Sequence, residues 1–219
     1  MRRTRPIVWL LILLLILCAG SASAQSRYDA LCEQQALKST KLIAWLEIPG
    51  ASFLQPVMRH PLDDAYYAKH APDDRPDANG ALYVQAKYNA DDFSDPVTLI
   101  YGGSAAEEAP FANLQQLYSG SHSGNCRTLY LHTKEETQEY FVFAALPYSS
   151  IHILHYYDFS NQRRFNGFFN SVFSTRVLSM HLDEKSRPWA GQDQVLILST
   201  GLRGDSLQRY LVMAKRITQ

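Results

Sequence analysis

The sequence has few cysteines, no low-complexity tract and no excess of one charge. Three of its 219 residues are cysteine. No Cys-x-x-Cys or His-Glu-x-x-His spacing occurs, so we expect no metal site and no cofactor. The 21 basic and 21 acidic residues balance, which leaves no electrostatic footprint for nucleic acid. Internal repeats are absent too, which favours one domain.

The N-terminus has the pattern of an export signal. Arginines at positions 2, 3 and 5 precede an apolar run of about 13 residues from Ile7 to Ala19. Ala22-Ser23-Ala24 then offers a small-x-small cleavage site, as in a secretory signal peptide. The run is shorter than the roughly 20 residues of a membrane span, yet an uncleaved anchor through residues 7–19 stays an alternative.

Residues 1–24 are therefore predicted to be a signal peptide, and residues 25–219 a single exported domain in the extracellular space or on the cell surface. The leader holds three arginines and no acidic residue, so the mature part has 18 basic and 21 acidic residues, a net charge of −3. This charge does not favour an anionic surface, and we expect membrane contact only through the N-terminal segment. Cys32 and Cys126 remain, and a disulfide and two free thiols both stay open.

The mature part is predicted to be one helix followed by β structure. Residues 25–45 place apolar side chains at three-to-four spacing, and Pro49-Gly50 follows as a stop. From residue 46 to residue 219, turn-rich segments separate short apolar runs, which is typical of a sandwich or closed barrel. The expected strands are Phe53–Met58, Gly80–Val84, Val97–Tyr101, Thr128–His132, Tyr140–Leu146, Gln194–Ser199 and Arg209–Ile217.

Two further helices are expected between these strands. One covers residues 110–118, and the other covers about Asn161–Phe173. The second carries an aromatic stripe that we expect to pack on the barrel, with peptide binding as the alternative. The stripe consists of Phe165, Phe168, Phe169, Val172 and Phe173.

Several fragments, taken in order, carry a resemblance to a known family. The last is a strand that ends in Leu198-Ser199-Thr200-Gly201, with Arg209 opening the next strand. The earlier ones are Leu42–Gly50 with its Trp45 and Ile48-Pro49-Gly50, then Gln55-Pro56-Val57, Asp64-Ala65-Tyr66-Tyr67, Gly80-Ala81-Leu82-Tyr83 and Val97–Gly102. In this order the sequence resembles class B sortases over nearly all of its mature part. The resemblance implies a mainly β fold, a closed antiparallel β-barrel of about eight strands with N-terminal and peripheral helices.

The resemblance also implies a chemistry that this chain lacks. Sortases are cysteine transpeptidases that need a thiol, a histidine and an arginine. The family's histidine position holds Gly103, its cysteine position holds Gly201, and only its arginine is present, as Arg209. The chain thus looks like a degenerate sortase, a pseudoenzyme with no intact catalytic residues, and Ser199, Thr200 and Arg209 are its candidate substrate-binding residues.

Other side chains could in principle replace the missing ones. Ser104, Ser199 and Thr200 flank the two glycines, but a hydroxyl needs a positioned base, and no histidine follows either motif closely. Cys126 with His122 or His132 is the other candidate pair, and its alternatives are a disulfide half or an unreactive thiol. His152 and His155 lie in an aromatic segment and are expected to line a loop or the wall of a groove.

Two functions from different classes follow. The first is a catalytically inactive peptide-binding or accessory module of cell-surface protein anchoring at the cell wall. Its partner would be a sorting-signal peptide, a surface protein or an active sortase. The alternative is an active cysteine transpeptidase or hydrolase that uses relocated residues.

Overall fold

The computed structural model describes residues 26–102, 108–118, 126–177 and 180–218. The predicted signal peptide, residues 1–24, lies outside the described residues. Within the described ranges, no helix is long and apolar enough to cross a membrane.

The first described element is a short helix, α2 (Arg27–Gln34). Its N-terminus is capped because the Ser26 hydroxyl accepts a hydrogen bond from the backbone N–H of Asp29 at 3.1 Å. Ala36 has a positive φ of 51°, and this left-handed residue ends the helical path. The prediction of a helix over residues 25–45 is therefore right at the start and wrong beyond Gln34.

The apolar run Leu42–Ile48 is a strand, β1, and its burial explains the error. Leu46 and Ile48 belong to the cluster inside the barrel. Trp45 instead packs outside the barrel with Leu31 of α2. A run that is buried on both faces lacks the alternation that distinguishes a strand from a helix.

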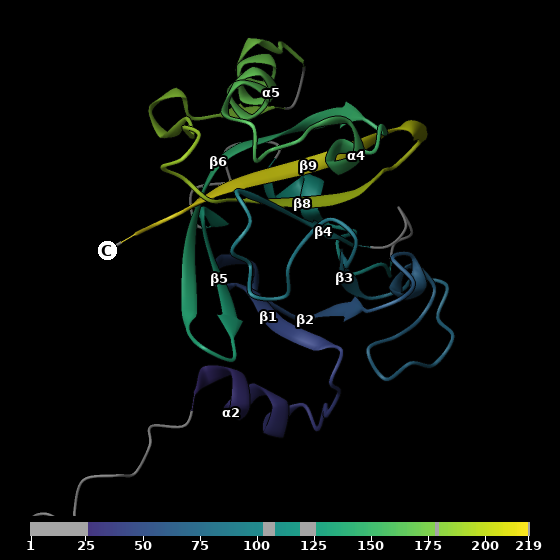
Figure 1. Cartoon of the computed structure of the whole chain (residues 1–219). Helices are drawn as coiled ribbons and strands as arrows, with labels where there is room; N and C mark the ends of the chain where they lie inside the picture. The colour runs from purple at the N-terminus through teal and green to yellow at the C-terminus, as the bar shows by residue number, and fades with distance from the viewer. Residues whose placement is uncertain (1–25, 103–107, 119–125, 178–179, 219) are drawn as a thin grey trace, which may run out of the picture.

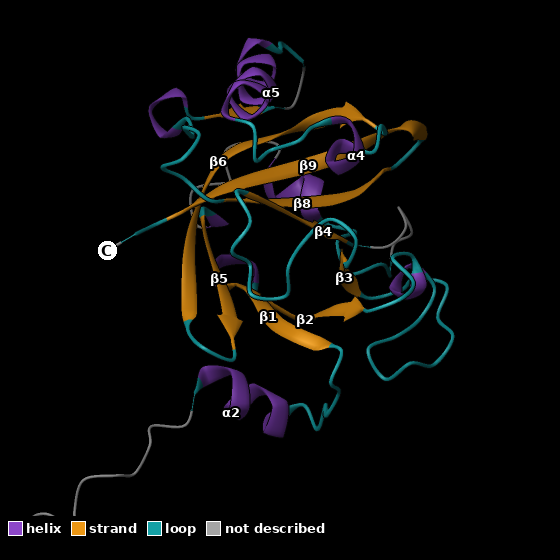
Figure 2. Ribbon diagram, in the orientation of Figure 1, coloured by secondary structure: helices purple, strands orange, loops and turns teal. Residues whose placement is uncertain are grey.

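Nine strands form one sheet in the part of the chain that the structure describes (Figures 1 and 2). The sheet order is β5-β1-β2-β3-β4-β8-β9-β6-β7, and pairing of β5 with β6 closes a ring of eight strands with β7 outside it. The expected closed barrel of about eight strands is confirmed. The strands after β1 are β2 (Phe53–His60), β3 (Leu82–Gln85), β4 (Val97–Tyr101), β5 (Thr128–Thr133), β6 (Thr137–Ser149), β7 (His181–Leu182), β8 (Val195–Leu202) and β9 (Asp205–Arg216).

Two neighbouring pairs of strands run parallel, β2 with β3 and β4 with β8. The barrel is thus antiparallel in most of its pairings rather than in all of them. The parallel pairing of β4 with β8 matters for the site, because parallel strands bring their carboxyl ends to the same edge of a sheet. In this barrel the last residue of β4, Tyr101, lies beside Ser199 of β8.

Helix α5 (Gln162–Ser174) covers the outer face of the sheet, and Figure 1 shows it on the opposite side of the barrel from α2. Asn161 caps it by accepting hydrogen bonds from the backbone N–H groups of Arg163 and Arg164. The whole aromatic stripe is buried against a cluster that includes Ile197 of β8 and Met213 of β9. The predicted packing of this helix on the barrel is confirmed.

Shorter helices lie in the connections between strands. They are α3 (Leu114–Tyr118), α4 (Ile153–Tyr156), η1 (Pro49–Ala51), η2 (Tyr66–Ala68) and η4 (Glu184–Ser186). The helix predicted over residues 110–118 thus forms only in its second half. Phe111, just before α3, packs so closely against Gly102 that a Cβ at position 102 would overlap the phenyl ring. Position 102 therefore requires glycine.

Candidate functional site

Near the end of β8, Gly201 pairs with Arg209 of β9. The Arg209 side chain reaches back along β8. Its Nε donates a hydrogen bond to Ser199 Oγ at 2.6 Å, and its Nη2 donates to the Ser199 carbonyl oxygen at 3.2 Å. Because side chains alternate along a strand, Ser199, Gly201 and Arg209 share one face. Arg209 is therefore held in place by the strand that carries Gly201.

Two stacked tyrosines lie beside the arginine. The Arg209 guanidinium carbon is 5.5 Å from the centre of the Tyr101 ring, within range of a cation–π contact. Tyr83 of β3 stacks on Tyr101 with 5.3 Å between ring centres. Burial raises the pKa of both tyrosine hydroxyls and lowers the pKa of Arg209. The side chain still carries its charge at neutral pH, because the guanidinium is not deprotonated in proteins.

One backbone contact joins the segment that leads to Gly103 with the strand that carries Gly201. The Gly102 N–H donates to the Ser199 carbonyl oxygen at 2.9 Å, so that oxygen accepts from both Gly102 and Arg209. Gly102 directly precedes Gly103, and Gly103 and Ser104 lie outside the described residues. The structure thus brings the residue before Gly103 next to the strand that carries Gly201.

Thr200 points away from this face. It is paired with Tyr210, whose side chain lies in the cluster inside the barrel. Thr200 is 3% exposed, and its hydroxyl is buried with no hydrogen-bond partner among the described residues. A small cavity of about 80 Å³ opens at this strand end, between α3 and β8. Its described lining is Ala112, Gln115, Gln116, Thr200, Gly201 and Arg203.

The aromatic segment after β6 approaches Tyr101 from another side. The His152 ring lies 4.8 Å from the Tyr88 ring and 6.5 Å from the Tyr101 ring, measured between centres. His152 also caps α4, since its Nδ1 accepts a hydrogen bond from the His155 backbone N–H at 3.1 Å. His152 therefore borders the ring that faces Arg209.

Of the two candidate cysteine pairs, the one between Cys126 and His132 is not assembled. Cys126 is buried in the barrel core, and burial raises the pKa of its thiol, which keeps the unreactive protonated form. Both nitrogens of His132 are engaged elsewhere, one with Thr137 and one with Glu47. His122 lies outside the described residues. Cys32 and Cys126 are both free thiols. Of the two alternatives, a disulfide or two free thiols, the structure therefore shows two free thiols.

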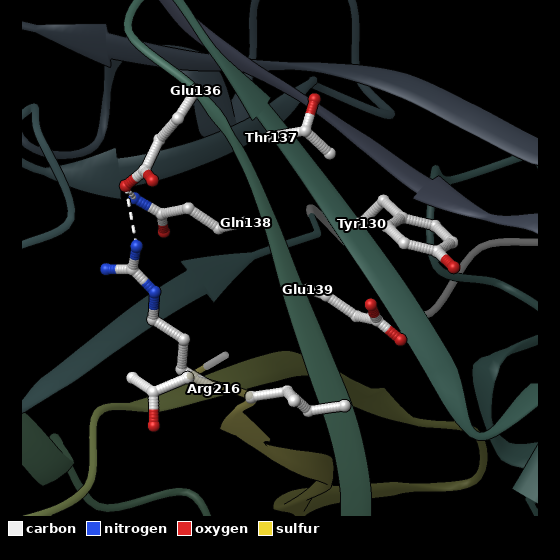
Figure 3. Close-up of a pocket in the computed structure, with 8 residues that line it drawn as sticks. Tyr130, Glu136, Thr137, Gln138, Glu139 and Arg216 are labelled. Atoms are coloured by element: carbon white, nitrogen blue, oxygen red, sulfur yellow. Dashed lines mark hydrogen bonds and ion pairs between the residues drawn. The ribbon is translucent and has the colours of Figure 1, made fainter.

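A larger cavity, of about 460 Å³, lies at the other end of β6 and β9 (Figure 3). It is polar and centred on the turn between β5 and β6. Arg216 of β9 and Glu136 form an ion pair in its wall, with 2.6 Å between Nη2 and Oε1. Its lining consists of Tyr130, Glu136, Thr137, Gln138, Glu139, Arg216, Ile217 and Thr218.

The structure thus brings together Ser199, Gly201 and Arg209 on one face and places Thr200 on the other. Tyr83 and Tyr101 complete that surface, and sequence reasoning did not single them out, although both lie within the fragments that carried the resemblance. Tyr101 directly precedes Gly102 and Gly103 in the sequence, which was the available signal for it, whereas Tyr83 follows Gly80 by three positions and carried no such signal. Among the described ranges, no three or more His, Cys, Asp or Glu side chains are arranged to hold a metal ion.

No family model and no curated protein matches the sequence. Solved structures do match, and class B sortases are among them. Sortase B of Clostridium perfringens aligns with a TM-score of 0.69 at 17% identity, covering 84% of this chain and all of that one. Sortase B of Bacillus anthracis aligns with a TM-score of 0.70 at 20% identity, covering 91% of this chain and 87% of that one.

A third match is a Streptococcus pyogenes class B sortase involved in pilus biogenesis. It has a TM-score of 0.69 and 18% identity, and covers 85% of this chain and 97% of that one. At such identities the likeness concerns the fold. The chain has the fold of class B sortases, and the predicted architecture is confirmed.

Proposed function

We propose that this chain is a class B sortase-like module, catalytically inactive as a transpeptidase, that binds peptide at the Arg209 surface and assists the anchoring of cell-surface proteins. It would act outside the cell or on its surface, released or held by residues 7–19. Its partner would be a sorting-signal peptide, a surface protein or an active sortase.

The observation that carries this proposal is the pair formed by Gly201 and Arg209. A transpeptidase needs a nucleophile at the end of β8, and glycine has no side chain to attack with. The arginine opposite is nevertheless positioned by two hydrogen bonds and a tyrosine ring. A positioned cation without a nucleophile supports binding rather than covalent chemistry.

The alternative, an active cysteine enzyme with relocated residues, has less support. It relies on Cys126, which is 4% exposed and has a raised thiol pKa. The hydroxyl of Ser199 accepts a hydrogen bond from Arg209, and a cation is no base for activating it.

Binding at this surface is tested by titrating the full chain with candidate sorting-signal peptides in a calorimeter. We expect measurable binding with no covalent adduct by intact mass spectrometry. Arg209→Ala should weaken it about tenfold or more, because a charged hydrogen-bonding group is lost. Arg209→Lys keeps the charge but loses the planar guanidinium group. Its peptide affinity should therefore lie between those of the unmodified chain and Arg209→Ala. Arg163→Ala, which removes an exposed arginine of α5, is the matched control. An acyl adduct, or equal loss in both alanine variants, contradicts the proposal.

A cysteine placed at position 201 tests whether the strand end is open to a ligand. In a Cys32→Ser background, Gly201→Cys should react with a thiol reagent at least about tenfold faster than buried Cys126. Peptide mapping assigns each adduct. Protection of the introduced thiol by bound peptide would place the ligand at β8, whereas labelling no faster than Cys126 would show a closed surface.

A further inference from the structure

A second group of reactive side chains lies away from Gly201, where β1, β5 and β6 adjoin. His132 of β5 stands between Glu47 of β1 and Thr137 of β6. The distance from His132 Nδ1 to Thr137 Oγ1 is 2.9 Å, and that from His132 Nε2 to Glu47 Oε2 is 2.7 Å. A hydroxyl, an imidazole and a carboxylate are thus joined in one chain of hydrogen bonds. We propose that Thr137 is the nucleophile of a second site, which hydrolyses small polar esters.

The carboxylate determines which nitrogen of His132 can act as a base. An ionised Glu47 only accepts hydrogen bonds, so Nε2 carries the proton that lies between them. In the neutral ring Nδ1 then has a lone pair, and Thr137 must be the donor in its contact with Nδ1. A nucleophile within reach of a base that a third group orients is the arrangement of covalent acyl-transfer enzymes.

The three side chains differ in exposure in the way that such chemistry requires. His132 is 5% exposed, and Tyr130 stacks on it with 6.3 Å between ring centres. Thr137 is exposed and lines the cavity of about 460 Å³ (Figure 3). The base is therefore fixed inside the protein, while Thr137 lies at the wall of the cavity.

The lining of the cavity indicates the class of substrate. Glu136 is neutralised by Arg216, and Glu139 adds a carboxylate on the side of β6 that carries Tyr130 (Figure 3). Most of the remaining lining is hydroxyl and amide, with Ile217 as its one aliphatic side chain among the described residues. A neutral or cationic polar ester fits this wall, whereas a long acyl chain or an acid does not.

The reaction balances with water as the only co-reactant. Thr137 Oγ1 adds to the ester carbonyl carbon as its proton passes to His132 Nδ1, which forms an imidazolium beside Glu47. The carbon–oxygen bond to the alcohol breaks, and the alcohol leaves with that proton. Water then attacks the acyl-Thr137 ester and gives a proton to Nδ1. Thr137 Oγ1 leaves and regains the proton, which releases the acid.

Hydrolysis of p-nitrophenyl acetate by the full chain is the test, together with mapping of an acetyl group on Thr137. We expect Thr137→Val to lose the rate above buffer by at least about 100-fold. Thr137→Ser should keep activity, because it keeps the hydroxyl that contacts His132. Thr128→Val, on the same hairpin, is the matched control and should leave the rate unchanged.

Three results would overturn the proposal: no hydrolysis above buffer, an undiminished rate in Thr137→Val, or acetyl groups only at other residues. Because Thr137 is exposed, its variants should fold, which circular dichroism checks. His132→Gln should also abolish turnover. If this variant unfolds, the comparison of Thr137→Val with Thr137→Ser still tests the proposal. Peptide binding at Arg209 is measured separately, so either proposal can fail alone.

Discussion

Each end of β9 carries an arginine, but the side chains around the two arginines differ. Near its start, Arg209 is bound to Ser199 and faces Tyr101, and the residue opposite it is Gly201. At its end, Arg216 pairs with Glu136 in the wall of a cavity that also holds Thr137. The first end has a positioned cation without a nucleophile. Near the second, the Thr137 hydroxyl lies within hydrogen-bond distance of His132, which in turn lies within hydrogen-bond distance of the Glu47 carboxylate.

This difference shows how much of a site belongs to the sheet and how much to single side chains. The ladder between β8 and β9 positions Arg209 whatever stands at position 201, because the pairing uses backbone groups. Reactivity depends on one side chain at that position. The backbone pairing of a sheet can therefore position one part of a site independently of the side chain that supplies the chemistry.

The largest expected effect comes from loosening the sheet that both ends share. Phe168 of α5 is fully buried in the cluster with Ile197 and Met213. Phe168→Ala should lower the free energy of unfolding by about 3–5 kcal/mol, because a large cavity forms in the core. Urea denaturation measures this loss. Hydrogen exchange should show lower protection near both Arg209 and Arg216, and a loss at one end alone would mean that the two ends are independent.

A smaller effect on the free energy of unfolding should distinguish the residues on the two faces of β8. Ser199→Ala removes the hydroxyl that accepts from Arg209 and should cost about 1–2 kcal/mol, since the bond involves a charged but half-buried partner. Thr200→Val removes a buried hydroxyl without a partner among the described residues, so it should be neutral or stabilising. Thermal unfolding of the two variants checks the contrast. Equal losses would show that Arg209 does not depend on Ser199.

The sequence predicted the frame of the Arg209 surface better than its lining. Val97–Tyr101 forms as expected, whereas the predicted strand Gln194–Ser199 begins one residue before β8 and ends three residues before its end at Leu202. The face shared by Ser199 and Arg209 follows from alternation and pairing. The contact of Tyr101 with Arg209 depends on the parallel pairing of β4 with β8, which no local pattern reveals.

The group around Thr137 could not be predicted from the sequence at all. Glu47 and His132 are 85 positions apart, and their contact exists only because β1 pairs with β5. The end of α2 was missed for a related reason, because Leu42–Ile48 is buried on both faces and shows neither helical nor strand alternation.

The smallest expected effect tests whether α5 only stabilises the sheet or also takes part in function at either end of β9. Gly167 lies in the middle of α5, and a Cβ built there would have no atom within 4 Å. Gly167→Ala should therefore raise the free energy of unfolding by about 0.5–1 kcal/mol, because alanine loses less backbone entropy in a helix. Urea denaturation, run in parallel with the Phe168→Ala variant, measures this change in the free energy of unfolding. Peptide binding at Arg209 and ester hydrolysis at Thr137 should not change. A change in either, without a loss of stability, would mean that the exposed side of α5 takes part in function.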